Sequence, residues 1–248
     1  MDNHTFASLI YPQLKDKVAI ITGGSKGIGL GIAHALLSQH IKVAITARSQ
    51  SDLDLAKAQL IQAFPAENIL CFQNDVRDLA GFQTVVDSIT SKWGNIDYVI
   101  ANAGVGHFAP IDQLSPDAWK DTIDINLTGV YNTVHATLET LKKSQGYIIT
   151  LASLAGTNFF ANGAAYNASK FGLVGFSQAI MLDLRKYGIK VSTIMPGSVT
   201  SYFNGHVPNE DDAWKIQPED IGKMVVDLIT MHPRTLPSKV EVRPSFPN

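Results

Sequence analysis

Three residues in the second half of the chain, Ser153, Tyr166 and Lys170, have the types and spacing to move a proton. Tyr166 and Lys170 are four positions apart, so on a helix their side chains lie on one face. A phenol ionises near pH ~10, and an adjacent ammonium lowers this pKa by favouring the phenolate. Ser153 falls where a preceding strand ends, so its hydroxyl could bond a substrate oxygen. The alternative is a surface pair, because Y-x-x-x-K occurs by chance in many helices.

A glycine-rich turn, G-G-S-K-G-I-G from Gly23 to Gly29, follows an apolar run at 17–22 and opens a helical pattern. The run is rich in β-branched residues and bounded by glycine, which predicts a buried strand of a parallel sheet. A helix that starts at such a turn presents free N–H groups and partial positive charge to an anion. Glycines let the backbone approach that anion closely, so the unit could cradle a pyrophosphate. A lone glycine pattern is weak evidence, but this one has the structural context that the motif requires.

Apolar runs and helical patterns alternate along the rest of the chain. The further strands are expected at 41–46, 68–73, 96–102, 147–152, 189–195 and 239–242. Helices are expected from Leu30 and at 51–64 (with Ser51 as N-cap), 79–92, 117–143, 164–187 and 218–231. This order predicts an α/β fold, a doubly wound parallel sheet of seven strands with helices on both faces. One domain is expected over 16–248, after a lead-in of residues 1–15 in which Pro12 does not suit regular structure.

Composition excludes several classes of partner. The 248 residues carry a formal net charge of −2 and no run of basic residues, so a nucleic-acid partner is not expected. No apolar run reaches membrane-spanning length, and an acid at position two argues against a signal peptide, so a cytoplasmic protein is expected. The single cysteine, Cys71, is interpreted as a small buried apolar residue. No metal site is expected, because the nearest histidines, His34 and His40, do not share a helical face.

The turn T-G-x-x-x-G-I-G, beginning at Thr22, resembles the nucleotide turn of the short-chain dehydrogenase/reductase family. The resemblance extends over 17–242, and it implies a single-domain Rossmann fold and a nicotinamide-dependent oxidoreductase. Its further motifs occur in the family's order, and they are Asn74-Asp75-Val76, Asn102-Ala103-Gly104, Asn126, Ser153, Tyr166 with Lys170, and Pro196-Gly197.

The end of the second predicted strand indicates which nicotinamide cofactor is bound. An acid there holds the ribose 2′-hydroxyl of NAD, whereas a cation suits the 2′-phosphate of NADP. Ala47 stands where the acid would be, and Arg48 follows it. The Arg48 guanidinium could bind a phosphate bidentately, and Lys26 could add a second positive charge, which predicts NADP(H) as the cofactor. The alternative is that both side chains are solvated surface cations. With Tyr166 and Lys170, the expected cofactor contacts are Gly23, Ser25, Lys26, Gly27, Ile28, Gly29, Arg48, Asp75, Val76, Asn102, Ala103, Gly104, Pro196, Gly197, Val199 and Ser201.

The resemblance also implies roles for four catalytic residues. Tyr166 is the acid/base and Ser153 steadies the carbonyl oxygen. Lys170 lowers the phenol pKa and binds the nicotinamide ribose, while Asn126 holds a water that relays protons to it. These roles agree with the chemistry, since donors aimed at an oxygen that gains charge stabilise the transition state. Taken alone, Asn126 could be an interior polar group and Ser153 a turn or cap residue.

A lid at about 198–216 is expected to cover a small carbonyl or alcohol substrate. Its aromatic and apolar residues suggest a substrate with a hydrophobic body, although they could simply dock the lid. His107 could touch substrate or be a solvated loop residue. The leading hypothesis is an NADPH-dependent carbonyl reductase, and the alternatives are a 3-oxoacyl-[acyl-carrier-protein] reductase and a catalytically idle dinucleotide sensor. By analogy with the family, the helices at 117–143 and 164–187 are expected to pack against their copies in a homodimer or homotetramer.

Overall fold

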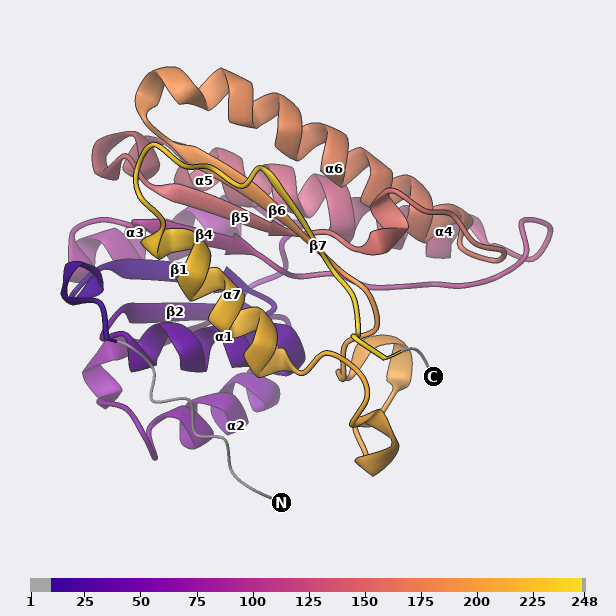
Figure 1. Ribbon diagram of the computed structural model, residues 1–248, viewed down its shortest axis with the longest axis horizontal. Coiled ribbons are helices and arrows are strands. Elements are labelled where there is room, and N and C mark those ends of the chain that lie inside the picture. The colour runs from indigo at the N-terminus through magenta and orange to yellow at the C-terminus, as the bar shows by residue number, and fades with distance from the viewer. Residues whose placement is uncertain (1–9, 247–248) are drawn as a thin grey trace.

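The computed structural model describes residues 10–246, and these form an α/β fold around one sheet (Figure 1). The seven strands pair in parallel in the order β3-β2-β1-β4-β5-β6-β7. Their bounds are β1 Val18–Thr22, β2 Lys42–Ala47, β3 Ile69–Gln73, β4 Tyr98–Ala101, β5 Tyr147–Leu151, β6 Lys190–Pro196 and β7 Lys239–Val242. The predicted seven-stranded, doubly wound parallel sheet is therefore confirmed.

Helices cover both faces of the sheet (Figure 1). Their bounds are α1 Gly27–Ser38, α2 Gln50–Leu60, α3 Leu79–Trp93, α4 Pro116–Ile123, α5 Gly129–Ser144, α6 Ala164–Leu184 and α7 Pro218–Thr230. Apolar side chains of α1, α2 and α7 pack with one set of strand residues, and those of α3, α5 and α6 pack with the other set. Alternate strand residues serve opposite faces, as with Val18 and Ala19 of β1, which is why the strands read as continuous apolar runs.

The helix predicted at 117–143 is interrupted. A π-helical turn, Asp124–Thr128, separates α4 from α5 and contains Asn126. Such turns are rare and occur often at functional sites. No proline interrupts residues 117–143, so the residue types do not mark the turn.

Two local predictions are wrong in detail. The N-cap of α2 is Ser49, whose hydroxyl accepts a hydrogen bond from the backbone N–H of Asp52, and Ser51 lies inside the helix. Pro12 begins a short 3₁₀ turn, Pro12–Leu14, because its fixed φ suits the first position of a helical turn. Leu14 of this turn is buried against the core.

The order of the strands reverses between β1 and β4, and the carboxyl ends of these strands meet at one edge of the sheet. Ligands of open α/β sheets bind in the crevice at such a switch point. The lid segment, 198–216, lies beyond the sheet and is drawn in orange to yellow in Figure 1. Its ends are tied together, because Thr200 N donates to Ile216 O at 2.9 Å and Ile216 N donates to Ser198 O at 3.1 Å. Within residues 10–246, no helix is both long and apolar enough to cross a membrane.

Candidate active site

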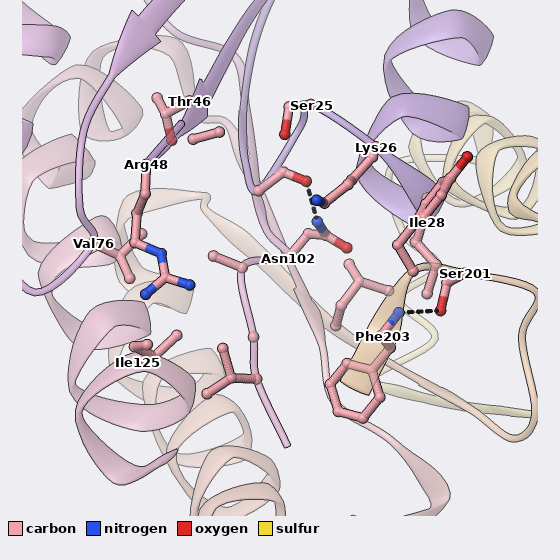
Figure 2. A pocket seen from close by; sticks show the side chains of 18 of the residues that line it. Ser25, Lys26, Ile28, Thr46, Arg48, Val76, Asn102, Ile125, Ser201 and Phe203 are labelled. Atoms are coloured by element: carbon pink, nitrogen blue, oxygen red, sulfur yellow. Dashed lines mark hydrogen bonds between the residues drawn. The ribbon is translucent and has the colours of Figure 1, made fainter. Parts of the chain in front are cut away.

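A cavity of about 620 Å³ lies at the switch point, beyond the carboxyl ends of β1, β2, β4 and β5. Most of the residues expected at the site line it. They are Gly23, Ser25, Lys26, Gly27, Ile28, Arg48, Asp75, Val76, Asn102, Ala103, Gly104, Tyr166, Lys170, Pro196 and Ser201. Figure 2 shows that side chains from the glycine turn, from the end of β2 and from the lid surround one space.

The glycine turn has the shape of an anion cradle. Gly23 and Gly27 have φ values of 65° and 55°, a left-handed conformation that side chains disfavour. A Cβ on Gly29 would collide with the carbonyl oxygen of Gly23, so only glycine fits at position 29. Asn102 fixes the turn, since its Nδ2 donates to Thr22 O at 2.9 Å and to Gly23 O at 3.0 Å (Figure 2). The first turn of α1 thus faces the cavity with N–H groups that an anion can satisfy.

The charged side chains at the far end of the cavity differ in how they are held. Lys26 is ion-paired with Asp52, with 3.2 Å between Nζ and Oδ2. The Arg48 side chain is exposed and makes no ion pair within residues 10–246. Among the residues that the structure describes, Arg48 thus has no ion-pair partner at the end of β2, whereas Lys26 is paired with Asp52.

Asp75 is fixed in place by a neighbouring arginine. The Arg77 guanidinium donates to both carboxylate oxygens of Asp75, with 2.6 Å between Nη2 and Oδ2, and it also bonds Asp121 at 2.9 Å. The hydrogen bond from Arg77 is the main reason that the pKa of Asp75 is lowered, and the charge of Arg48 contributes. His107 Nε2 lies 3.0 Å from Asp121, outside the lining of the 620 Å³ cavity.

Thr46, at the end of β2, was not singled out in the sequence. It is fully buried and lines the cavity, yet its Oγ1 has no hydrogen-bond partner in the described chain. A buried hydroxyl without a partner is uncommon in native proteins, and a polar group bound in the cavity would satisfy it. The glycine turn, Arg48 and Thr46 together fit a phosphorylated nucleotide ligand.

Helix α6 carries Tyr166 and Lys170 on its cavity side. The Lys170 ammonium is almost completely buried; its Nζ donates to Leu151 O at 3.0 Å and lies 5.6 Å from the centroid of the Tyr166 ring. Burial lowers the pKa of Lys170 to about 8. Burial also raises the pKa of Tyr166, and the Ser153 hydroxyl opposes this shift. The direction for Tyr166 is opposite to the sequence-based expectation, because desolvation of the phenolate is the larger effect.

Ser153 follows β5 and combines two roles. Its hydroxyl accepts a hydrogen bond from Ala155 N at 3.1 Å, so it caps the 3₁₀ turn Leu154–Gly156. The same hydroxyl is the group that lowers the pKa of Tyr166. Ser153 can therefore cap the 3₁₀ turn and still bond a substrate oxygen. Capping uses one lone pair of the hydroxyl oxygen and leaves its proton available for donation.

Asn126 is fully buried in the π-helical turn and joins the loop after β4 to α6. Its Oδ1 accepts from Val105 N at 2.8 Å, while its Nδ2 donates to Val105 O at 2.8 Å and to Ser169 Oγ at 3.0 Å. These three bonds occupy both amide protons and hold the loop beside Gly104. The geometry favours the structural role for Asn126 that the sequence left open.

Several expected residues do not line the cavity. Gly29 supports the turn from inside α1, and Gly197 N donates to Val242 O at 2.8 Å, which ties it to β7. Val199 pairs with Ile216 at the base of the lid and packs against the core, and its expected cofactor contact stays a prediction. Lining residues not among the expected contacts are Thr46, Ala47, Ser49, Asp52, Asn74, Val105, Ile125, Leu151, Ala152, Tyr202 and Phe203. Asn74 belongs to a motif that the sequence analysis named, and Tyr202 and Phe203 belong to the predicted lid.

Comparisons with known proteins agree with this architecture. The family model described as short chain dehydrogenase matches residues 17–212. An uncharacterized oxidoreductase of Staphylococcus saprophyticus is 30% identical over 240 residues, which is 94% of this chain and 99% of the relative. A protein of Streptomyces coelicolor assigned as a ketoacyl reductase is 30% identical over 229 residues, 90% of this chain and 87% of the relative.

Solved structures give the same result. An alcohol dehydrogenase from Thermococcus sibiricus, complexed with 5-hydroxy-NADP, superposes with a TM-score of 0.86 at 26% identity, over 94% of this chain and 98% of that one. A metagenomic short-chain oxidoreductase in complex with NADP has a TM-score of 0.81 at 31% identity. The match covers 94% of this chain and 99% of that one. The cavity at the switch point, the glycine turn and these matches together show that the chain is an oxidoreductase of the short-chain dehydrogenase/reductase family.

Proposed function

We propose that this protein reduces a ketone or aldehyde to the alcohol, with NADPH as hydride donor. The observation that carries the proposal is that the Tyr166 phenol lines the same cavity as the glycine turn, with the Ser153 hydroxyl close enough for a hydrogen bond that lowers its pKa. The raised pKa of Tyr166 supports a proton donor, because the phenol keeps its proton at neutral pH.

The residues of the chain divide the work as follows. Bound at the glycine turn, the nicotinamide cofactor supplies a hydride to the carbonyl carbon. Tyr166 donates its proton to the carbonyl oxygen, and Ser153 donates a hydrogen bond to the same oxygen. Lys170 places a positive charge near the phenolate that remains, and its pKa of about 8 lets it exchange a proton with solvent near neutral pH. Asn126 holds the loop at Val105, which borders the reacting centre.

The preference for NADP(H) rests on Arg48. Its unpaired guanidinium at the end of β2 suits a 2′-phosphate, and neighbours of similar fold are complexed with NADP. Lys26 adds positive charge but shares it with Asp52. Asp75 and Val76 would border the adenine, and Asn102, Ala103 and Gly104 the adenosine ribose.

A second candidate is the reduction of 3-oxoacyl thioesters, which the relationship to the S. coelicolor protein favours. The test is NADPH oxidation, followed by absorbance, against ketones, aldehydes, diketones and 3-oxoacyl thioesters. Reduction of free carbonyl compounds with the highest kcat/KM supports the proposal. A thioester preference selects the second candidate, and no turnover with any of them would indicate a dinucleotide sensor.

We also propose a homodimer or homotetramer formed through α5 and α6. The exposed apolar side chains on these helices include Tyr131, Phe171 and Leu182, of which Leu182 is 60% exposed. Light scattering in solution checks this, and a monomeric mass contradicts it.

A further inference from the structure

Two aromatic rings from separate segments pack against the ring of Tyr166. Phe108 belongs to the loop after β4, and Phe203 belongs to the lid. The Tyr166 ring centroid lies 5.4 Å from that of Phe108 and 5.5 Å from that of Phe203, with interplanar angles of 64° and 56°. Phe108 also packs on Phe160, from the loop before α6, at 5.9 Å. We call Phe108, Phe160 and Phe203 the aromatic mouth.

The aromatic mouth depends on a glycine in the backbone beneath it. Gly106 is buried beneath two of the rings, and a Cβ there would lie 2.5 Å from the tip of Phe203 and 2.8 Å from the tip of Phe108. The two loops are joined, since Ala109 N donates to Asn162 O at 3.0 Å. The Phe203 ring of the lid thus packs over Gly106, in the loop after β4.

The mouth is open to a ligand. Phe203 lines the cavity, and Figure 2 shows its ring on the side of the cavity away from Arg48. Phe108 and Phe160 are 38% and 48% exposed, so their rings offer apolar surface beside the proton donor. An exposed apolar cluster of this kind marks a binding surface.

Building on the proposed function, we propose that the substrate is an aryl ketone or aryl aldehyde, with the aromatic ring attached to the carbonyl carbon. A substrate with its carbonyl oxygen at the Tyr166 hydroxyl lies in the cavity that Phe203 lines, and Phe108 packs on both Phe203 and Tyr166 next to it. Rings gain from edge-to-face and offset contact beyond the area that they bury, which a saturated ring of similar size does not share. Phe203 is thus the specificity-determining residue, and Gly106 positions it.

The test compares two ketones of similar volume, 1-phenylethanone and 1-cyclohexylethanone. The kcat/KM ratio, aryl over cyclohexyl, is measured with NADPH for the wild type and for Phe203→Leu. We expect the variant to lower the ratio about threefold to tenfold, the range of one or two aromatic contacts. Because the result is a ratio of ratios, the different intrinsic reactivities of the ketones cancel.

Two further variants sharpen the comparison. Gly106→Ala keeps Phe203 but displaces its ring, so the ratio should fall there as well. Phe159→Leu is the matched control, because Phe159 is 87% exposed and outside the aromatic mouth, and its ratio should equal that of the wild type. Calorimetric titration of the NADPH-loaded enzyme with 1-phenylethanol and 1-cyclohexylethanol gives a readout independent of turnover, because neither partner can accept a hydride. Phe203→Leu should weaken only the binding of 1-phenylethanol, by a similar factor.

The outcomes separate this inference from the proposed function. An unchanged ratio in both Phe203→Leu and Gly106→Ala overturns the aryl assignment while carbonyl reduction stands. Reduction of thioesters or diketones but of neither probe also overturns it. Loss of NADPH oxidation with every carbonyl compound overturns both proposals.

Discussion

The ammonium of Lys170 is buried with its Nζ 3.0 Å from the carbonyl oxygen of Leu151, the last residue of β5. One hydrogen bond does not replace full hydration of a charge, so burial lowers the pKa of this lysine from 10.5 to about 8. The folded protein therefore holds a charged group that would be better solvated in the unfolded chain.

The stability of the protein should consequently depend on pH through Lys170. Between pH 8 and 10.5 the unfolded lysine keeps a proton that the folded one has lost, so the free energy of unfolding rises with pH. The difference in unfolding free energy, wild type minus Lys170→Met, should increase by about 2 kcal/mol from pH 7 to pH 10. Urea denaturation at several pH values measures this, and a flat difference contradicts it.

Replacing Tyr166 by phenylalanine should abolish turnover and spare the fold. The variant removes the proton donor but keeps the ring that packs on Phe108 and Phe203. We expect kcat to fall by about 10²–10⁴, the contribution of a positioned acid. NADPH binding, followed by fluorescence, should be retained; residual activity near that of the wild type would refute the assignment.

Arg48→Ala should weaken the preference for NADPH over NADH more than Lys26→Ala does. Arg48 is unpaired, whereas Lys26 is already neutralised in part by Asp52. Loss of a charge-assisted phosphate contact should raise the NADPH Kd by about tenfold to a hundredfold. The control is NADH affinity, which should change little, and equal effects on both cofactors would contradict the assignment.

Asn126→Ala should destabilise the protein. It leaves the N–H and the carbonyl of Val105 without these partners in a partly buried region, which costs about 1–3 kcal/mol. Asn158→Ala is the matched control at an exposed site, where the change should stay within about 0.5 kcal/mol. Denaturant unfolding compares the two, and equal midpoints would contradict the structural role.

Asp212→Asn should loosen the lid. The carboxylate of Asp212 is bonded by Lys215 and His206, and these bonds lower its pKa to about 2. Because the folded pKa lies below the usual value of 3.8, this anchoring is present above pH 4 and is lost as the pH falls toward 2. Hydrogen exchange at neutral pH should be faster in 198–216 of the variant than of the wild type. Unchanged protection there would show that the lid is held by other contacts.

Local patterns were sufficient to predict the fold. Apolar β-branched runs such as that of β1, alternating with amphipathic helices, permit few arrangements, and short right-handed crossovers select the parallel sheet. The π-helical turn at Asn126 was not predicted, because no proline marks it in the sequence. The N-cap was predicted at Ser51 and lies at Ser49, because the backbone geometry decides which hydroxyl reaches the N–H of Asp52.

By itself, the sequence determined the family, the alternation of strands and helices, and the identity of the polar residues that could do chemistry, since these follow from residue types and spacing. Only the tertiary structure decided how those residues are held: that Asp52 pairs with Lys26 while Arg48 stays free, and that burial raises the pKa of Tyr166. It also brought Phe108 and Phe203 against Tyr166, and Phe160 against Phe108. Desolvation and contacts between distant segments depend on the packed chain, and no local pattern encodes them.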